Sequence, residues 1–261
     1  MRTTTLARVG AAVLGASLVL TACSDGDSGE ASDDSSAAGS PSESSSDTGD
    51  DGFADQDAKA IAQAGKDAMA ALTSVRVAGS ITDDGQEIGI DLATSTEGDC
   101  TGSISLGGAS VELLGVDGQT WFKPDDAFWS SQAGAQGEAI ARLVAGRWVV
   151  VPADDENFSQ FCDLDSLLDE LIDDDGEADD TYEKGEVTDV DGTETVPVTN
   201  TSQDSGPATA YIQVDGEHYL LKVERTGDGA TGEINFSEFD EPVDAQAPAA
   251  EDAVDLEELG N

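Results

Sequence analysis

Basic residues and histidine are scarce in this chain of 261 residues, which has 11 Lys and Arg against 56 Asp and Glu and a formal net charge of −45. A surface this negative repels a phosphate backbone, so we expect no nucleic-acid binding. The single histidine, His218, is too little for the usual zinc sites or for most histidine-dependent catalysis. These scarcities argue against an enzyme.

Common catalytic and metal-binding motifs are missing as well. The chain has no Gly-x-Ser-x-Gly sequence, which marks the nucleophile of many hydrolases. Residues 173–176 and 189–192 each place Asp before Gly, as calcium loops do. In that register the twelfth ligand position falls on Tyr182 or Val198, and neither side chain can bind calcium. We therefore predict no dedicated metal site and no cofactor.

The N-terminal segment has the features of a bacterial lipoprotein leader. Arg2 and Arg8 precede an apolar run over residues 9–20, which fits a signal-peptide core better than a membrane span of about 20 residues. Leu20-Thr21-Ala22-Cys23 follows directly and resembles a lipobox, in which the Cys thiol receives diacylglycerol and the chain is cut before it.

We therefore predict a signal peptide over residues 1–22 and a lipid anchor, including palmitate, on Cys23. Two acyl chains are enough for stable anchoring. The protein would then lie on the extracytoplasmic face of the cell membrane and contact the membrane through this diacylglyceryl anchor. The alternative is an ordinary secretory signal followed by a chance cysteine.

Two cysteines, Cys100 and Cys162, remain after residue 23. An even number of cysteines in a chain exported to an oxidising compartment predicts a disulfide. The alternative is two separate thiols.

Two acidic segments flank the expected folded domain. Residues 24–52 contain no Lys or Arg and no large apolar side chain, so they cannot bury enough surface to offset the entropy of ordering. We expect residues 23–53 to be the lipidated cysteine and a disordered tether; a specific acidic recognition segment is the alternative. Residues 242–261 are expected to form an acidic, mostly disordered tail with one helical turn, which leaves residues 54–241 as the domain.

Hydrophobic periodicity within that domain predicts an α+β fold. Ile61, Gly65, Met69 and Leu72 lie at helical spacing within residues 54–73. The residues that follow alternate apolar and polar, and Asp-Gly pairs separate the runs, as in antiparallel hairpins. Residues 140–144 and 161–172 predict two helices between the two strand-rich halves. We expect a single curved antiparallel sheet, a half-barrel, with helices packed on its concave face.

The region 54–240 resembles a family of actinobacterial lipoproteins, the LppX/LprG type with a LolA-like half-barrel. The resemblance rests on the lipobox, the acidic tether, Leu72-Thr73-Ser74-Val75-Arg76-Val77, and Val116-Asp117-Gly118-Gln119-Thr120-Trp121-Phe122-Lys123 followed by Phe128-Trp129. It implies a domain whose sheet and helices enclose an apolar cavity. Some members of the family bind acylated lipids or glycolipids and move them through the envelope.

Apolar side chains expected between sheet and helices are the candidates for lining such a cavity. They are Ile90, Leu92, Ile104, Leu106, Leu113, Trp121, Trp129, Phe161, Leu168 and Leu171. The resemblance implies a membrane-anchored lipoprotein that binds or transfers a lipid or glycolipid. The alternative is an envelope interaction or sensory lipoprotein with a solid core, whose protein partner the sequence does not indicate.

Overall fold

The structure is a computed structural model that describes residues 52–83, 85–133, 136–152, 156–172, 181–201, 206–227 and 230–255. The predicted signal peptide, Cys23 and the tether up to residue 51 lie outside the described residues. Among the described helices, none combines the length and the apolar character that crossing a membrane requires.

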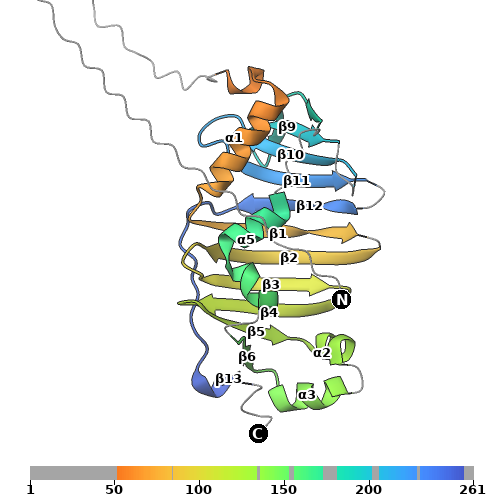
Figure 1. Cartoon of the computed structure of the whole chain (residues 1–261), viewed down its shortest axis with the longest axis vertical. Coiled ribbons are helices and arrows are strands. Elements are labelled where there is room, and N and C mark those ends of the chain that lie inside the picture. The colour runs from red at the N-terminus through yellow and green to blue at the C-terminus, as the bar shows by residue number, and fades with distance from the viewer. Residues whose placement is uncertain are drawn as a thin grey trace, which may run out of the picture. The chain divides into compact units, whose positions relative to one another are not determined.

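One large open sheet dominates the described residues (Figure 1). Its strands follow the order β13-β6-β5-β4-β3-β2-β1-β12-β11-β10-β9-β7, and β8 also pairs with β9. The first half is the meander β1 (Ser74–Asp83), β2 (Gln86–Ser95), β3 (Cys100–Leu106), β4 (Ala109–Val116) and β5 (Gln119–Pro124), with β6 (Trp148–Val150) beside it. The second half contains β7 (Tyr182–Lys184), β8 (Thr188–Val190), β9 (Thr193–Asn200), β10 (Ala208–Gln213), β11 (Leu220–Thr226) and β12 (Ala230–Ser237). The two halves join where β1 pairs with β12.

Two of the Asp-Gly pairs form tight hairpin turns, as predicted. Asp117 and Gly118 have φ angles of 51° and 78° between β4 and β5, and Asp191 and Gly192 have 51° and 90° between β8 and β9. Positive φ at both central residues is the geometry of the tight type I′ hairpin turn, which Asp-Gly tolerates.

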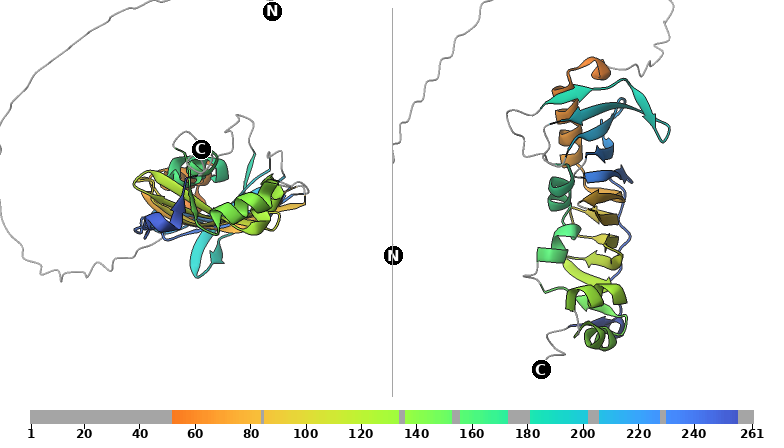
Figure 2. Two further views of the ribbon diagram at one scale, coloured as in Figure 1. Left: turned by 90° about the horizontal axis from the view of Figure 1, so that it is seen from below. Right: turned by 90° about the vertical axis from the view of Figure 1, so that its right-hand side faces the viewer.

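The helices cover one face of the sheet (Figure 2). A short 3₁₀ helix, η1 (Phe53–Asp55), precedes α1 (Ala58–Ala70). The Asp57 side chain accepts a hydrogen bond from the Ala60 amide at 3.0 Å, so α1 begins later than predicted. Beyond the meander come α2 (Asp126–Ala133), α3 (Gly137–Val144), α4 (Glu156–Ser159), η3 (Gln160–Cys162) and α5 (Leu164–Ile172). The predicted α+β half-barrel is confirmed.

Two predictions differ from the structure. Phe128 and Trp129, which follow a strand in sequence, lie on α2, a helix that was not predicted. The C-terminal tail was expected to contain one helical turn, and η4 (Ala250–Asp252) is such a turn, but the two-residue strand β13 (Ala253–Val254) that follows it was not predicted. β13 pairs in parallel with β6, and Val254 is buried there. This pairing covers the edge of β6, whose backbone groups would otherwise lack hydrogen-bond partners within the sheet.

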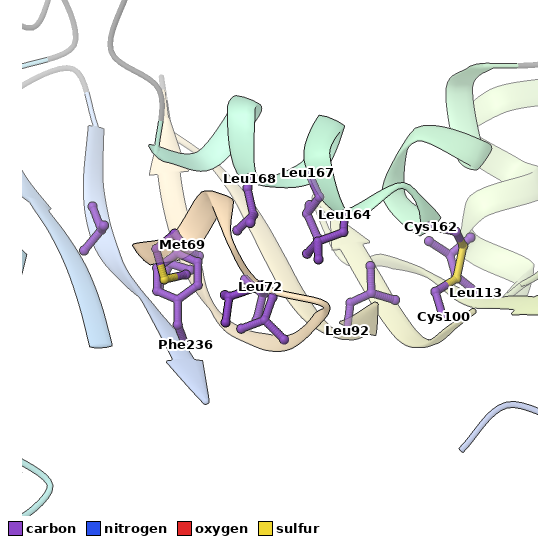
Figure 3. Packing of buried hydrophobic residues seen from close by; sticks show 14 of the residues in the cluster. Met69, Leu72, Leu92, Cys100, Leu113, Cys162, Leu164, Leu167, Leu168 and Phe236 are labelled. Carbon is purple, nitrogen blue, oxygen red and sulfur yellow. A yellow bond between two sulfur atoms is a disulfide. The ribbon is translucent and has the colours of Figure 1, made fainter. Parts of the chain in front are cut away.

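The core lies between the concave face of the sheet and the helices. Figure 3 shows Leu164, Leu167 and Leu168 of α5 on the side of the helix that faces the strands. The predicted disulfide is present, and it joins Cys100 at the start of β3 to Cys162 in η3, with 5.1 Å between the two Cα atoms. It holds the segment that leads into α5 against the sheet.

Candidate ligand-binding site

A pocket of about 530 Å³ lies between α5 and the middle of the sheet. Its floor comes from β1, β2, β3, β11 and β12, and its roof from η3 and α5. The lining residues are Ile81, Asp83, Ile88, Ile90, Ile104, Gln160, Phe161, Ser166, Leu167, Glu170, Leu171, Arg225, Ala230 and Ile234. The floor is therefore mainly isoleucine.

Strand pairing brings these isoleucines together. Ile81 lies opposite Ile88, and Ile90 lies opposite Ile104. Directly opposed residues on one face of an antiparallel pair have Cβ atoms about 4.5–5.5 Å apart. The result is a continuous branched aliphatic surface on the concave face.

Two glycines interrupt that surface and leave room above the floor. Gly79 lies between Ile90 and Ile234, and Gly232 lies opposite Ile81. Their φ angles are 156° and 138°, and a Cβ at either position would lie 2.1 Å from a carbonyl oxygen of the neighbouring strand. At both glycines the backbones of adjacent strands approach closely, which permits the sheet to bend. Because neither glycine has a side chain, the floor is lower at these two positions, and more space remains beneath α5.

The pocket is closed at one end of the strands and open at the other. Along β1, Val75 and Val77 are buried, Ile81 is half-buried and Asp83 is exposed. Ile88, at the open end of β2, is 43% exposed. The exposed carboxylates Asp83 and Glu170 therefore lie at the rim, whereas the interior is aliphatic.

A second pocket of about 80 Å³ adjoins the first between α1, the end of α5 and strands β7 and β9–β11. The two pockets share Leu171 and Arg225. A groove of about 260 Å³ between α1 and α5 in turn shares Lys66 and Ile172 with the second pocket. The end of α5 thus separates three neighbouring hollows.

The residues proposed from the sequence fall into different places. Ile90, Ile104, Phe161 and Leu171 line the large pocket. Leu92, Leu113, Trp129 and Leu168 are buried in the packed core, and Leu168 also borders the groove beside α1.

The other two proposed residues are not part of the lining of the large pocket. Trp121 alternates with the buried Phe122 on β5, so its half-buried ring faces the opposite side of the sheet. Leu106, at the end of β3, is 43% exposed and lies outside the lining.

Several lining residues were not proposed from the sequence. Ile81 and Ile88 continue the alternation of their strands, so their inward positions could have been inferred. Leu167 belongs to the apolar stripe of α5. Arg225 and Ile234 carried no such signal, because they reach the pocket only through the long-range pairing of β11 and β12 with β1.

His218 holds the beginning of the domain in place. Its ring stacks on Phe53 with 3.7 Å between the centroids, and its Nδ1 lies 3.1 Å from the Gln213 carbonyl oxygen. These contacts fasten η1 to the loop between β10 and β11, far in sequence from η1.

No protein-family model matches the chain, and no curated protein matches it. Among solved structures, LprF from Mycobacterium bovis is 19% identical, and the match covers 74% of this chain and 97% of LprF with a TM-score of 0.52. The lipoprotein LppX from Mycobacterium tuberculosis is 18% identical over 72% of this chain and 98% of LppX, with a TM-score of 0.41. The likeness to LprF shows the fold, and this chain therefore has the open half-barrel that the sequence resemblance predicted.

Proposed function

We propose that this protein is a lipid-anchored extracytoplasmic lipoprotein that binds the hydrophobic chain of a lipid or glycolipid beneath α5. The observation that carries the proposal is the pocket of about 530 Å³ on the concave face. Its volume lies in the range of about 300–1,000 Å³ that is typical of small-molecule sites. The half-barrel fold, and the lipid-binding role that the sequence resemblance implies, support the same function.

The lining suits an alkyl chain more than a polar ligand. Isoleucines on four adjacent strands face Leu167 and Leu171 of α5, so a chain placed between them would lose its contact with water on both sides. Burial of apolar surface contributes about 25 cal/mol per Å². The polar groups lie toward the rim, where a head group would stay near solvent.

Binding can be tested on the chain from residue 24 onward, which keeps every described residue. In Ile104→Trp the added indole would occupy the pocket, and we expect uptake of a fluorescent hexadecyl probe to fall at least tenfold. Ser103→Trp is the matched control, since Ser103 adjoins Ile104 on β3 but its side chain lies on the opposite face of the sheet and outside the lining. This variant should bind as the unaltered chain does.

Two negative results together would overturn the proposed function. The protein would take up no hexadecyl probe, and mass spectrometry would detect no lipid on the protein purified from its host. Equal binding by the Ile104→Trp and Ser103→Trp variants would place any ligand elsewhere.

The anchor needs its own test on the full chain. Cys23→Ala should abolish labelling by palmitate and leave the protein uncleaved or released from membranes. A Cys23→Ala protein that is processed, labelled and membrane-bound as before would contradict the lipid anchor.

A further inference from the structure

Three hairpins turn at the open side of the large pocket, and one of them is uncharged. β1, β3 and β11 all end on this side of the sheet (Figure 1). The sequences that follow β1 and β11 contain Asp84 and Asp228, whereas β3 and β4 are joined by Gly107 and Gly108. Residues 100–111 contain no Asp, Glu, Lys or Arg, although 26% of the chain is charged. The β3–β4 hairpin is therefore a neutral element in a strongly acidic protein.

The tip of this hairpin also exposes large apolar side chains. Leu106 of β3 and Ile88 of β2 lie opposite each other, and each is 43% exposed. The two turn glycines are exposed, and Ala109 on the other side of the turn is half-buried. We call Ile88 and residues 106–109 together the apolar lip. The lip presents aliphatic side chains and neutral backbone to solvent.

The apolar lip continues the aliphatic floor of the large pocket. Leu106 follows Ile104 by two residues on β3, so both side chains lie on the concave face. Along β2, burial falls toward the lip: Leu92 is fully buried, Ile90 is half-buried and Ile88 is exposed. Ile88 also lines the pocket. One aliphatic surface therefore leads from the interior of the pocket to solvent.

The carboxylates of the pocket mouth belong to other elements. Asp83 ends β1 and Glu170 lies on α5, and both line the pocket. Glu87 precedes Ile88 on β2, so its exposed side chain lies on the convex face. The lip is thus the neutral part of the mouth. A partner without net charge fits it better than an anionic one, which this acidic protein repels.

We propose that the apolar lip docks on a lipid bilayer whose surface has no net charge, so that a ligand chain passes between bilayer and pocket without entering water. This inference rests on the proposed function, because the pocket must hold that chain. Two exposed aliphatic side chains bind a bilayer only weakly, and the predicted anchor on Cys23 would keep the lip near it.

The length of chain before the domain is sufficient for this contact. Residues 24–51 separate Cys23 from Gly52, and 28 residues span at most about 100 Å. Phe53, which follows Gly52, is fastened to the loop between β10 and β11 through His218. The strands from β11 to β3 cover only about 20 Å across the sheet. An anchored domain can therefore turn its lip toward the membrane.

Transfer of a fluorescent hexadecyl probe from phosphatidylcholine vesicles to the protein tests the lip on the chain from residue 24 onward. If the lip docks, the transfer rate rises in proportion to the protein concentration at a fixed vesicle concentration. If the probe passes through water, its escape from the vesicle sets the rate, which then does not depend on the protein. We expect the first behaviour.

Leu106→Ser should slow this transfer about fivefold, as expected for the loss of a half-exposed leucine from the contact. Displacement of dissolved probe by hexadecanol, which needs no bilayer, should change less than twofold because Leu106 is not in the lining. Leu143→Ser is the matched control, since Leu143 of α3 is 48% exposed and is likewise not in the lining. It should change neither measurement.

Transfer that does not depend on protein concentration, or equal rates in the two serine variants, would overturn docking while the proposed function stands. An equal loss of transfer and of hexadecanol binding in Leu106→Ser would also overturn it, because Leu106 would then act inside the pocket. Dimers in sedimentation experiments that Leu106→Ser abolishes would show that a second copy occupies the lip instead of a bilayer. Absence of both transfer and hexadecanol binding in the unaltered chain would overturn the proposed function.

Discussion

Two parts of the concave face have the same alternating pattern but are filled differently. Near β4–β6, the aromatic cluster Phe122, Phe128, Trp129 and Phe158 packs beneath α2 and α4, with Phe122 and Phe158 stacked at 4.6 Å between centroids. Beneath α5, the floor of isoleucine and glycine leaves a pocket of about 530 Å³. We call these two parts the aromatic cluster and the hollow.

The difference lies in side-chain size rather than in pattern. An aromatic side chain buries about 150–250 Å² and can reach a helix above the sheet. Isoleucine is shorter, and Gly79 and Gly232 contribute no side chain to the floor. Alternation therefore places residues inside the half-barrel, and the volume of each inward residue decides whether the inside is filled.

The disulfide ties β3 to η3, the segment that connects α4 of the aromatic cluster to α5 above the hollow, and its removal should have the largest effect. Replacing both Cys100 and Cys162 by Ser opens a loop with a sequence separation of 62 residues. We expect a loss of about 4 kcal/mol in the free energy of unfolding on the loop-entropy model. Because α5 follows Cys162 closely, binding of hexadecanol should weaken as well. Urea denaturation and probe displacement measure the two effects; unchanged values in the variant would contradict this role.

Truncation at matched positions compares the two parts directly. Phe122→Ala should cost about 3 kcal/mol, because it leaves a cavity among rings that pack on every side. Ile90→Ala should cost only about 1 kcal/mol, below the usual value, because Ile90 is half-buried and already borders a pocket. Urea midpoints check both. Equal costs would show that the hollow is packed as tightly as the aromatic cluster.

Adding a methyl group to the floor tests why the hollow exists. In Gly79→Ala the new Cβ would meet the Glu233 carbonyl oxygen at 2.1 Å, so the strands must shift. We expect a loss of about 2 kcal/mol and weaker uptake of the hexadecyl probe. Gly108→Ala is the control: its φ is also positive, but a Cβ there meets nothing within 4 Å. It should cost about 1 kcal/mol through backbone strain alone, without a change in uptake.

The smallest effect is expected at the closed end of the hollow. The Asp240 carboxylate accepts hydrogen bonds from the Thr73 amide at 2.8 Å, the Thr73 hydroxyl at 2.7 Å and the Tyr219 hydroxyl at 3.0 Å. These bonds, the Thr73 amide first, lower the pKa of Asp240 below its usual value. The carboxylate therefore stabilises the fold above its unfolded pKa of about 3.9, and this contribution is lost as the pH falls through the lower folded value.

Asp240→Asn should accordingly cost less than about 1 kcal/mol at pH 7, because solvent screens an exposed carboxylate, and the cost should shrink further in acid. Urea denaturation of both proteins at several pH values measures the difference. A gap that stays constant or widens in acid would contradict the assignment. Uptake of the hexadecyl probe at pH 7 should be unchanged, because Asp240 lies outside the pocket lining.

Local patterns predicted much of the fold. The spacing of Ile61, Gly65 and Met69 indicates α1, and all three are buried. Alternation and Asp-Gly turns indicate the first meander, and an even count of cysteines indicates the disulfide. Each of these signals acts over a few residues or follows from the compartment that the N-terminal segment predicts.

What the sequence did not predict depends on contacts between distant segments. In the sequence, Val254 is an apolar residue within an acidic tail. It becomes part of the sheet because it pairs with the open edge of β6. Phe128 and Trp129 resemble strand residues until their packing on Phe122 places them on α2. Arg225 becomes a lining residue because β12 brings it near β1. The size of the pocket depends on the height of α5 above the floor, which no local pattern encodes.

The pairing of β1 with β12 also has a consequence for how the protein must fold. Ala78 of β1 and Asn235 of β12 lie side by side although 157 residues separate them in sequence. Closing so long a loop costs entropy before any contact compensates for it, and sheets built from such pairs fold slowly. The floor of the pocket can therefore form only after nearly the whole chain has been made. A shortened chain that ends before β12 would lack both the centre of the sheet and a place for a ligand.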